Sequence, residues 1–216
     1  MAKSRRIMLA VSLTIVLVSF LASILLYNSL PAIMISHWDS VGNANGYMPK
    51  FWAAFLVPFI SLFLLLLFIL LPKIDPLRKN IEKFRADYNK LIILLMIFML
   101  YIHILTLLLN RGYEFNIVSM MLPSLGILFY YTGILIQNSK RNWTIGIRTQ
   151  WTLSSERVWN RTNRLGGKLF KISGILAIVG FLSGKYAIFL VIVPVILSAI
   201  FLIIYSYLLY RKEKKH

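Results

Sequence analysis

The sequence contains no cysteine among its 216 residues. Structural disulfides, thiolate metal sites and cysteine nucleophiles are therefore excluded, and cysteine usage says nothing about the redox compartment. Acidic residues are also scarce, with 7 Asp and Glu against 24 Lys and Arg. Only 14% of the residues are charged and 59% are hydrophobic, whereas a soluble domain is about one quarter charged. The chain has too little polar surface to cover itself in water, so we expect most of it to lie in lipid.

Long apolar runs without charge predict the membrane spans. A helix of about 20 apolar residues crosses the hydrocarbon core of a bilayer, and five runs reach this length. A sixth run is shorter and contains Lys171, which would have to reach the headgroups or lie in a short span. We therefore predict an all-α, polytopic membrane protein, a single domain over residues 1–216, with six transmembrane helices arranged as three hairpins. The predicted spans are residues 7–27, 51–71, 91–109, 117–136, 169–182 and 186–209.

The distribution of positive charge predicts the orientation. If Lys171, near the start of the fifth span, is counted with the loop before it, 21 of the 24 Lys and Arg lie before the first span, in the loops after the second and fourth spans, or in the C-terminal tail. The three exceptions are Lys50, Arg111 and Lys185. Cytoplasmic loops accumulate Lys and Arg, so we expect both chain ends in the cytoplasm. The N-terminal run is longer than a signal-peptide core and lacks a small-residue cleavage pattern, which favours a retained first helix. This distribution explains the net charge of +17 without direct binding of nucleic acid.

The first external loop, residues 28–50, contains a compact group of polar and aromatic side chains. His37, Trp38 and Asp39 are consecutive, Gly42 and Asn45-Gly46 predict turns with positive φ, and Tyr47 is a typical interfacial aromatic. One interpretation is a turn anchored at the membrane surface by its aromatic residues. The other is an external recognition surface or metal surface, although His37 and Asp39 are too few to complete a metal site.

His103 is the only histidine inside a predicted span, where ionisable groups are functional candidates. The next external turn contains Glu114. His37, His103 and Glu114, together with Asp39, are therefore candidate metal ligands at the outer face, and an intramembrane metal-dependent enzyme is one alternative. The competing interpretation is a neutral imidazole that hydrogen-bonds to a neighbouring helix. Because no HExxH or other metal-spaced pair occurs, we expect no cofactor.

The cytoplasmic loop at residues 140–168 combines basic and apolar periodicity. Gly146 suggests a turn, and Ser154 is a candidate N-cap with Glu156 in the first helical turn. A helix from Ser155 would bring its basic side chains to one face, next to a largely apolar stripe with Trp159 beside it. The basic residues are Arg157, Arg161, Arg164 and Lys168. This pattern predicts an interfacial amphipathic helix before the fifth span, which contacts anionic headgroups or docks an acidic partner. Gly166-Gly167 would then be a hinge.

Two segments together resemble a known family. The cytoplasmic loop is similar to the signature loop of SdpI-like immunity proteins at Ile145-Gly-Ile-Arg-Thr149, Trp151-Thr-Leu-Ser-Ser155, Val158-Trp159 and Arg164-Leu-Gly-Gly-Lys168. The external loop from Pro31 to Lys50 resembles a membrane domain of unknown function that is common at the start of that family. Two departures fall in the cytoplasmic motif: Gln150 stands where the family usually has Pro, and Asn163 where it usually has His.

The resemblance implies a non-enzymatic immunity and sensor protein in the plasma membrane. Such a protein gives resistance to a secreted peptide toxin and draws a cytoplasmic transcriptional repressor to the membrane. The external loop would face the toxin with His37, Trp38, Asp39, Gly42, Gly46 and Tyr47. The cytoplasmic motif would comprise Gly146, Arg148, Trp151, Ser154, Trp159, Arg164, Gly166 and Gly167. A small-solute or lipid transporter is a further alternative, but the spans hold no Asp or Glu for a proton relay.

Overall fold

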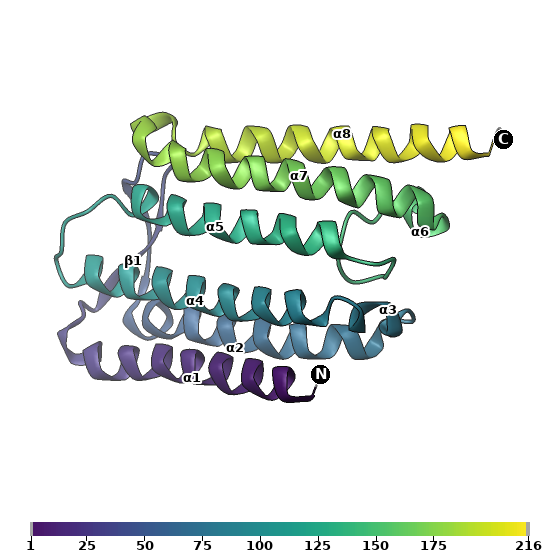
Figure 1. The fold of residues 1–216 in the computed structure, drawn as a ribbon. Helices are drawn as coiled ribbons and strands as arrows, with labels where there is room; N and C mark the ends of the chain where they lie inside the picture. Colours follow the sequence, from purple (N-terminus) through teal and green to yellow (C-terminus); the bar gives the residue numbers. More distant parts are fainter. Residues whose placement is uncertain (1, 215–216) are drawn as a thin grey trace.

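The computed structural model describes residues 2–214, apart from the side chains of Ala2 and Lys185. Six helices are long and apolar enough to cross a membrane, which confirms the prediction of a helical membrane protein with six spanning helices. They lie roughly side by side as a bundle (Figure 1). Their bounds are α1 Ala2–Leu26, α2 Lys50–Ile74, α4 Arg85–Asn110, α5 Ile117–Asn138, α7 Glu156–Gly180 and α8 Phe189–Glu213.

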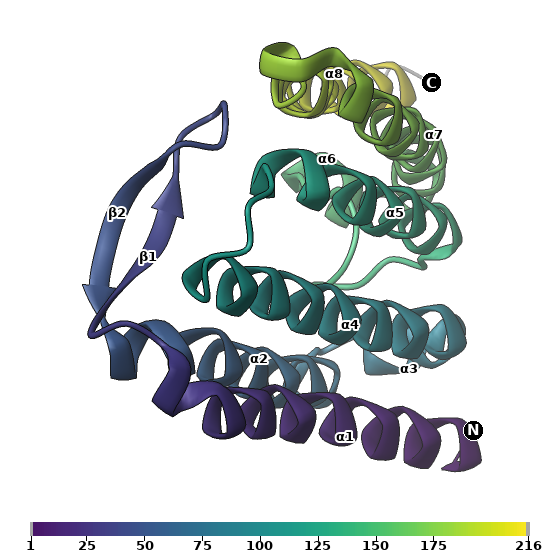
Figure 2. The same ribbon diagram turned by 90° about the vertical axis from the view of Figure 1, so that its left-hand side faces the viewer.

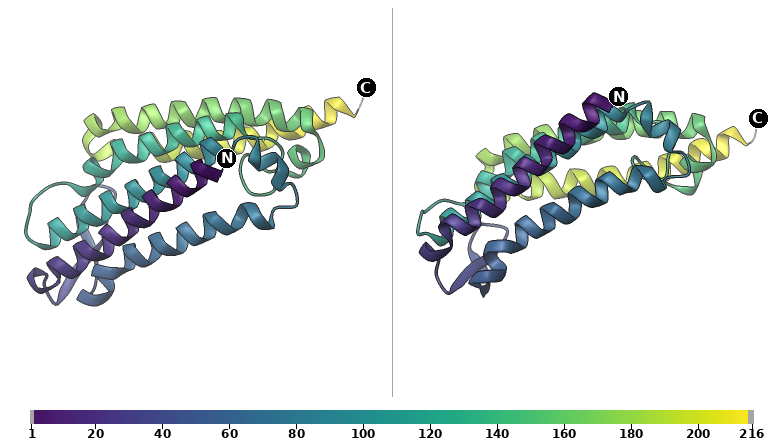
Figure 3. Two further views of the ribbon diagram at one scale, coloured as in Figure 1. Left: turned by 60° about the horizontal axis from the view of Figure 1, so that its bottom comes forward. Right: turned by 90° about the horizontal axis from the view of Figure 1, so that it is seen from below.

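Short elements join the long helices at both ends of the bundle. They are η1 Tyr27–Ser29, β1 Ile33–Trp38, β2 Ala44–Pro49, α3 Arg78–Glu82, α6 Gln150–Ser154 and η2 Phe181–Tyr186. The start of α1 and the end of α8 lie at the same end as α3 and α6 (Figure 1), and we call this the basic end. The strands and η2 lie at the opposite end, the hairpin end, as two further views also show (Figure 3). Lys215, one of the C-terminal cations counted in the sequence analysis, lies outside the described residues.

The loop between α1 and α2, which is expected outside the cell, is a β-hairpin, and the sequence analysis did not predict this. Strands β1 and β2 pair antiparallel, with Ile35 opposite Tyr47 and Met34 opposite Met48. The hairpin stands beside the ends of the long helices (Figure 2). Met34 is fully buried and packs with α2 and α4 residues. Because a two-stranded sheet is only marginally stable alone, this contact with the helices stabilises the hairpin.

The prediction of a separate amphipathic helix with a glycine hinge is wrong. Helix α7 runs without interruption from Glu156 to Gly180, so the short predicted span is only its second half. The N-cap is Ser155, whose hydroxyl accepts a hydrogen bond from the Val158 amide at 3.2 Å. Ser154, the predicted cap, ends α6 and donates to the Gln150 carbonyl at 2.6 Å. Glu156 does lie in the first turn of α7, as predicted.

Glycines bring α5 and α7 into backbone contact. A Cβ atom at Gly126 would lie 2.6 Å from the Gly174 carbonyl oxygen, and one at Gly133 would lie 2.6 Å from the Gly167 carbonyl oxygen. The two glycines of each helix are about two turns apart, so they lie on one face. Small residues at such positions let membrane helices pack closely. Gly167 is therefore a packing residue, and Gly166 likewise fits against the side chains of Ile147 and Leu202.

Labelling of single cysteines tests the orientation of the bundle. Lys83 at the basic end and Glu114 at the hairpin end are both exposed, and the chain has no native cysteine. An impermeant maleimide added to intact cells should label Glu114→Cys and spare Lys83→Cys, because the basic end is expected in the cytoplasm. Both positions should react after permeabilisation. Labelling of Lys83→Cys alone in intact cells would reverse the orientation.

Candidate functional site

Asp39 closes the turn of the hairpin. Its carboxylate accepts hydrogen bonds from the amides of Val41 at 3.0 Å and Asn43 at 2.9 Å, and from Asn43 Nδ2 at 3.2 Å. The backbone hydrogen bond from Asn43, supported by those from Val41 and Gly42, holds the pKa of Asp39 below its usual value. The carboxylate oxygens are thus engaged within the turn. Asp39 shapes the loop, as short acidic side chains often do in turns.

Two asparagines fix the hairpin to the helix ends. Asn110, the last residue of α4, accepts a hydrogen bond from the Ile35 amide at 2.7 Å and donates to the Ile35 carbonyl at 3.0 Å. Its side chain thereby acts as a strand partner on the free edge of β1. Asn116 donates to the Val41 carbonyl at 2.7 Å, and its oxygen caps α5 by accepting from the Ser119 amide at 3.0 Å. The sequence analysis missed both, although an asparagine directly before an apolar run is a typical N-cap.

The two hairpin glycines have different roles. Gly42 has a φ of +94°, as predicted for a turn, and a Cβ there would lie 2.5 Å from Asn116 Nδ2. Gly46 lies in β2 and does not have the positive φ that we predicted. It is instead opposite His37, whose Cβ would be 2.7 Å from an added Cβ. The space that Gly46 leaves is what allows His37 to pair across the bulged strand.

The hairpin has an outward face and an inward face. Tyr47 and Ile33 are 62% and 58% exposed, and His37 and Asn45 are also exposed. Trp38 instead packs inward against the apolar cluster of α4, α5, α7 and α8 residues at this end. Trp38 is partly buried and contributes to packing at this end, so its predicted place on a ligand-facing surface stays a prediction. The outward face, defined by Ile33, His37, Asn45 and Tyr47, is the accessible surface of the hairpin.

The structure does not bring the candidate metal ligands together. His37 Nδ1 is 2.6 Å from Asn45 Oδ1, whereas His103 is fully buried in α4, with Nε2 2.8 Å from Ser23 Oγ of α1. The Ser23 hydroxyl also donates to the Ala54 carbonyl of α2 at 2.5 Å. Within residues 2–214, no group of three His, Asp or Glu could hold a metal ion, Glu114 included. The His103–Ser23 pair joins α4 to α1, and Ser23 joins α1 to α2.

At the basic end, the predicted turn is packed on α7. Gly146 has a φ of +116°, and an added Cβ would lie 2.6 Å from Asn163 Oδ1 and 3.0 Å from the Trp159 ring. The Trp159 side chain is fully buried and donates to the Ser139 carbonyl at 3.1 Å. Asn163 Oδ1 accepts from the Ile147 amide at 2.7 Å. Asn163, one of the two residues that depart from the family pattern, is therefore a structural anchor of the motif.

A buried carboxylate joins the two loops of the basic end, and the sequence analysis did not identify it. Asp75 is 4% exposed and accepts from the Trp143 amide at 2.9 Å and from Thr144 Oγ1 at 2.6 Å. Its other oxygen accepts from the Leu77 amide at 2.7 Å. Asn142, fully buried, stabilises the same turn by accepting from the Thr144 and Ile145 amides. The loop between α2 and α4 and the loop between α5 and α7 thus form one folded unit.

The motif also contacts α8. The ring centroids of Trp151 and Tyr207 are 5.1 Å apart, and Thr149 Oγ1 donates a hydrogen bond to Ser206 Oγ at 3.1 Å. Ser155 Oγ donates to Glu213 Oε2 at 2.7 Å. Arg148 donates to the Trp143 carbonyl within the loop, and Arg164 is exposed on α7. Thr149, Trp151 and Ser155 therefore hold the loop between α5 and α7 against α8.

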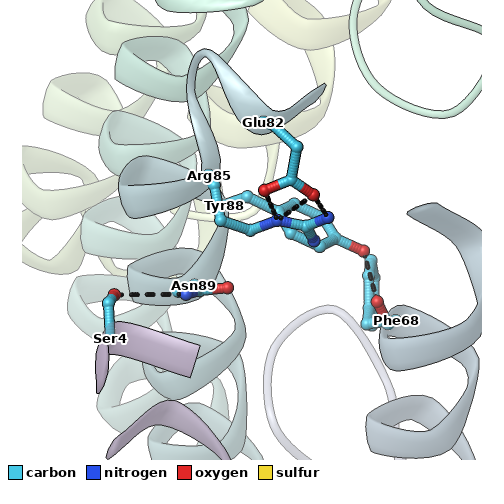
Figure 4. Close-up of polar contacts among 6 residues, drawn as sticks. All are labelled: Ser4, Phe68, Glu82, Arg85, Tyr88 and Asn89. Atoms are coloured by element: carbon cyan, nitrogen blue, oxygen red, sulfur yellow. Dashed lines mark hydrogen bonds and ion pairs between the residues drawn. The ribbon is translucent and has the colours of Figure 1, made fainter. Parts of the chain in front are cut away.

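Helix α4 begins with a second set of polar contacts, shown in Figure 4. Arg85 forms an ion pair with Glu82, and this hydrogen-bonded partner lowers the pKa of Glu82 below its usual value. The Tyr88 hydroxyl donates to the Phe68 carbonyl of α2 at 2.7 Å, and Asn89 Nδ2 donates to Ser4 Oγ of α1 at 3.3 Å. These contacts join α1, α2 and α4 at the basic end.

A six-helix bundle with ordered polar units at both ends defines the chain as a multi-pass membrane protein. Residues 138–206 match the SdpI/YfhL protein family, and residues 14–62 match a domain of unknown function, DUF1648. Immunity protein SdpI of Bacillus subtilis (strain 168) is 35% identical over 203 residues, covering 94% of this chain and 95% of that protein. The chain belongs to the SdpI/YfhL family and is of the membrane immunity protein type. No solved structure matches it.

Proposed function

We propose that this protein protects its producer from a secreted peptide toxin, which meets the outward face of the hairpin, and that it does so without degrading the toxin. The observation that supports this most is the hairpin itself. It is an ordered surface at the end expected outside the cell, and Asn110 and Asn116 hold it at two points. A surface fixed in this way loses little conformational entropy on binding. The likeness to an immunity protein over nearly the full chain supports the same proposal.

We further propose that occupation of the hairpin is transmitted to the basic end, where the motif around Gly146 engages a cytoplasmic repressor. The contacts that could carry this coupling are continuous. Asn116 caps α5, α5 packs through its glycines on α7, and α7 anchors the motif through Trp159 and Asn163. Because packed helix pairs move as units, a displacement of the α5 cap by a ligand would be passed to α7.

Substitution of Tyr47 tests the toxin-facing surface. Tyr47→Ala should lower protection of a toxin-sensitive host about tenfold or more, because an exposed aromatic at the centre of a recognition surface is a typical hot spot. Tyr113→Ala is the matched control, since Tyr113 is a 56% exposed aromatic at the same end but outside the hairpin. The dose of toxin that halts growth is measured at equal membrane levels of each variant. Equal loss from both variants, or disappearance of intact toxin from the medium, would contradict the proposal.

A further inference from the structure

The exposed face of α7 at the basic end carries unpaired cations around shared cavities. We define the basic bay as Arg157, Arg161, Arg164 and Lys168 of α7, with Lys140 beside α5 and Lys212 of α8. Arg161 lines three neighbouring hollows. It shares a hollow of about 340 Å³ with Arg157 and Lys212, one of about 270 Å³ with Arg164 and Lys168, and one of about 310 Å³ with Lys140 and Arg164. Arg161 is therefore at the centre of the bay.

The cations of the bay have no acidic partner in the described part of the chain. The ion pair found within residues 2–214 joins Arg85 and Glu82, which are outside the bay. Glu213 lines the largest hollow, but one of its oxygens accepts the Ser155 hydroxyl, and no cation of the bay lies within 4.0 Å of it. Gathered cations repel one another, and a bound anion would relieve that repulsion. Guanidinium groups are well suited to phosphate, which they bind in bidentate geometry.

The surroundings of the bay are apolar, which indicates the kind of anion. Val158 and Leu209 line the largest hollow, and Leu165 and Tyr205 line the next. Further along the same stripe of α7, Ile172 and Ile175 are 52% and 50% exposed. The stripe thus changes from cationic to apolar in the direction of the bilayer centre. A ligand that matches it has a negative group at one end and hydrocarbon at the other.

We infer that the basic bay is a binding site for an anionic glycerophospholipid. The headgroup phosphate would lie against Arg161 between Arg157 and Lys212, and an acyl chain would follow the exposed apolar stripe of α7 beside α8. This site is independent of the toxin and of the proposed function. It differs from the general lipid belt because a particular arginine, common to all three hollows, holds the headgroup. A bound lipid would also fasten α7 to α8 next to the motif.

Lipid titration of the purified full-length protein in neutral detergent tests this site. Phosphatidylglycerol should raise the melting temperature saturably, and phosphatidylcholine should not. Arg161→Gln should weaken the apparent affinity for phosphatidylglycerol by about fivefold or more, the equivalent of the roughly 1 kcal/mol per basic residue near an anionic surface. Lys83→Gln is the matched control: it removes an exposed cation at the same end but outside the bay, and it should change the affinity less than about twofold.

Each alternative outcome has a distinct meaning. Equal weakening by Arg161→Gln and Lys83→Gln would overturn the site in favour of diffuse charge attraction. Stabilisation by inorganic phosphate or glycerol phosphate as strong as that by the lipid would show a site for free anions. Equal stabilisation by a poly-glutamate peptide would assign the bay to an acidic protein partner. If Arg161→Gln itself lowers the melting temperature without lipid, Arg161→Lys should restore the fold and part of the affinity, and failure to do so would contradict phosphate binding.

Discussion

Replacing Gly167 by alanine is expected to destabilise the protein by about 1–3 kcal/mol, the usual cost of overpacking a tight interface. The added Cβ would lie 2.5 Å from the Gly133 carbonyl oxygen and 2.7 Å from the Gln137 Cβ, so α5 and α7 would have to separate. The cost arises even though alanine favours an isolated helix over glycine by about 1 kcal/mol. Gly167→Ile should prevent folded protein from accumulating in the membrane.

Gly180→Ala is the matched control for this prediction. Gly180 is also helical and buried in α7, but an added Cβ would lie 3.3 Å from its nearest neighbour, the Ala187 carbonyl oxygen. A small adjustment can provide that space, so we expect little change in the melting temperature of the detergent-solubilised protein. If Gly167→Ala and Gly180→Ala have equal melting temperatures, the contact between α5 and α7 is not the close interface described above.

The number of spans could be predicted because it depends on local properties. Run length and charge placement identify a membrane helix without knowledge of its neighbours, and six spans were found in this way. The hairpin could not be predicted by the same means. Its strands are short, and β1 is held by Asn110, which is 75 residues further along the chain than its partner Ile35. Pairing that depends on such a distant side chain leaves no local pattern in the strand itself.

The continuous α7 shows the opposite error, in which a local pattern was given too much weight. The basic stripe and the glycine pair suggested a surface helix followed by a hinge. The stripe is exposed as predicted, with Arg157, Arg161 and Arg164 outward, but the glycines face α5 and the Ile147 side chain. A glycine can serve a hinge or a close contact, and only the position of the facing helix distinguishes the two.

The residues that organise the basic end were missed for a related reason. Asp75 and Asn142 were not identified, and Asn163 was noted only as a departure from the family pattern. All three are buried polar groups whose partners come from other parts of the chain or from an irregular turn. Their types are those of ordinary loop residues, and sequence gives no sign of their burial. By contrast, Gly146 and Trp159 were identified through the family motif. The structure supplies the reason for that motif, because the glycine is packed directly against the tryptophan ring.

Asp75→Ala is expected to have the largest effect at the basic end. It removes the acceptor of the Trp143 amide, the Thr144 hydroxyl and the Leu77 amide together. Hydrogen bonds to a charged acceptor contribute about 1.5–3 kcal/mol each, and their contributions are not additive. We therefore expect the substitution to lower the free energy that holds the two loops together by about 3 kcal/mol. The turn that carries Gly146 should then open frequently, while the six helices remain folded.

Limited proteolysis measures this opening at the exposed Arg148. If trypsin cleaves the transiently opened loop, a loss of about 3 kcal/mol should speed cleavage after Arg148 roughly hundredfold. Thr144→Val removes one of the hydrogen bonds and should give a rise of about tenfold or less. Asp87→Ala is the control, because Asp87 accepts from Asn138 at the same end without touching the turn. An unchanged cleavage rate in Asp75→Ala would mean that the two loops fold independently. The coupling proposed between α7 and the repressor surface would then have to pass through Trp159 and Asn163 alone.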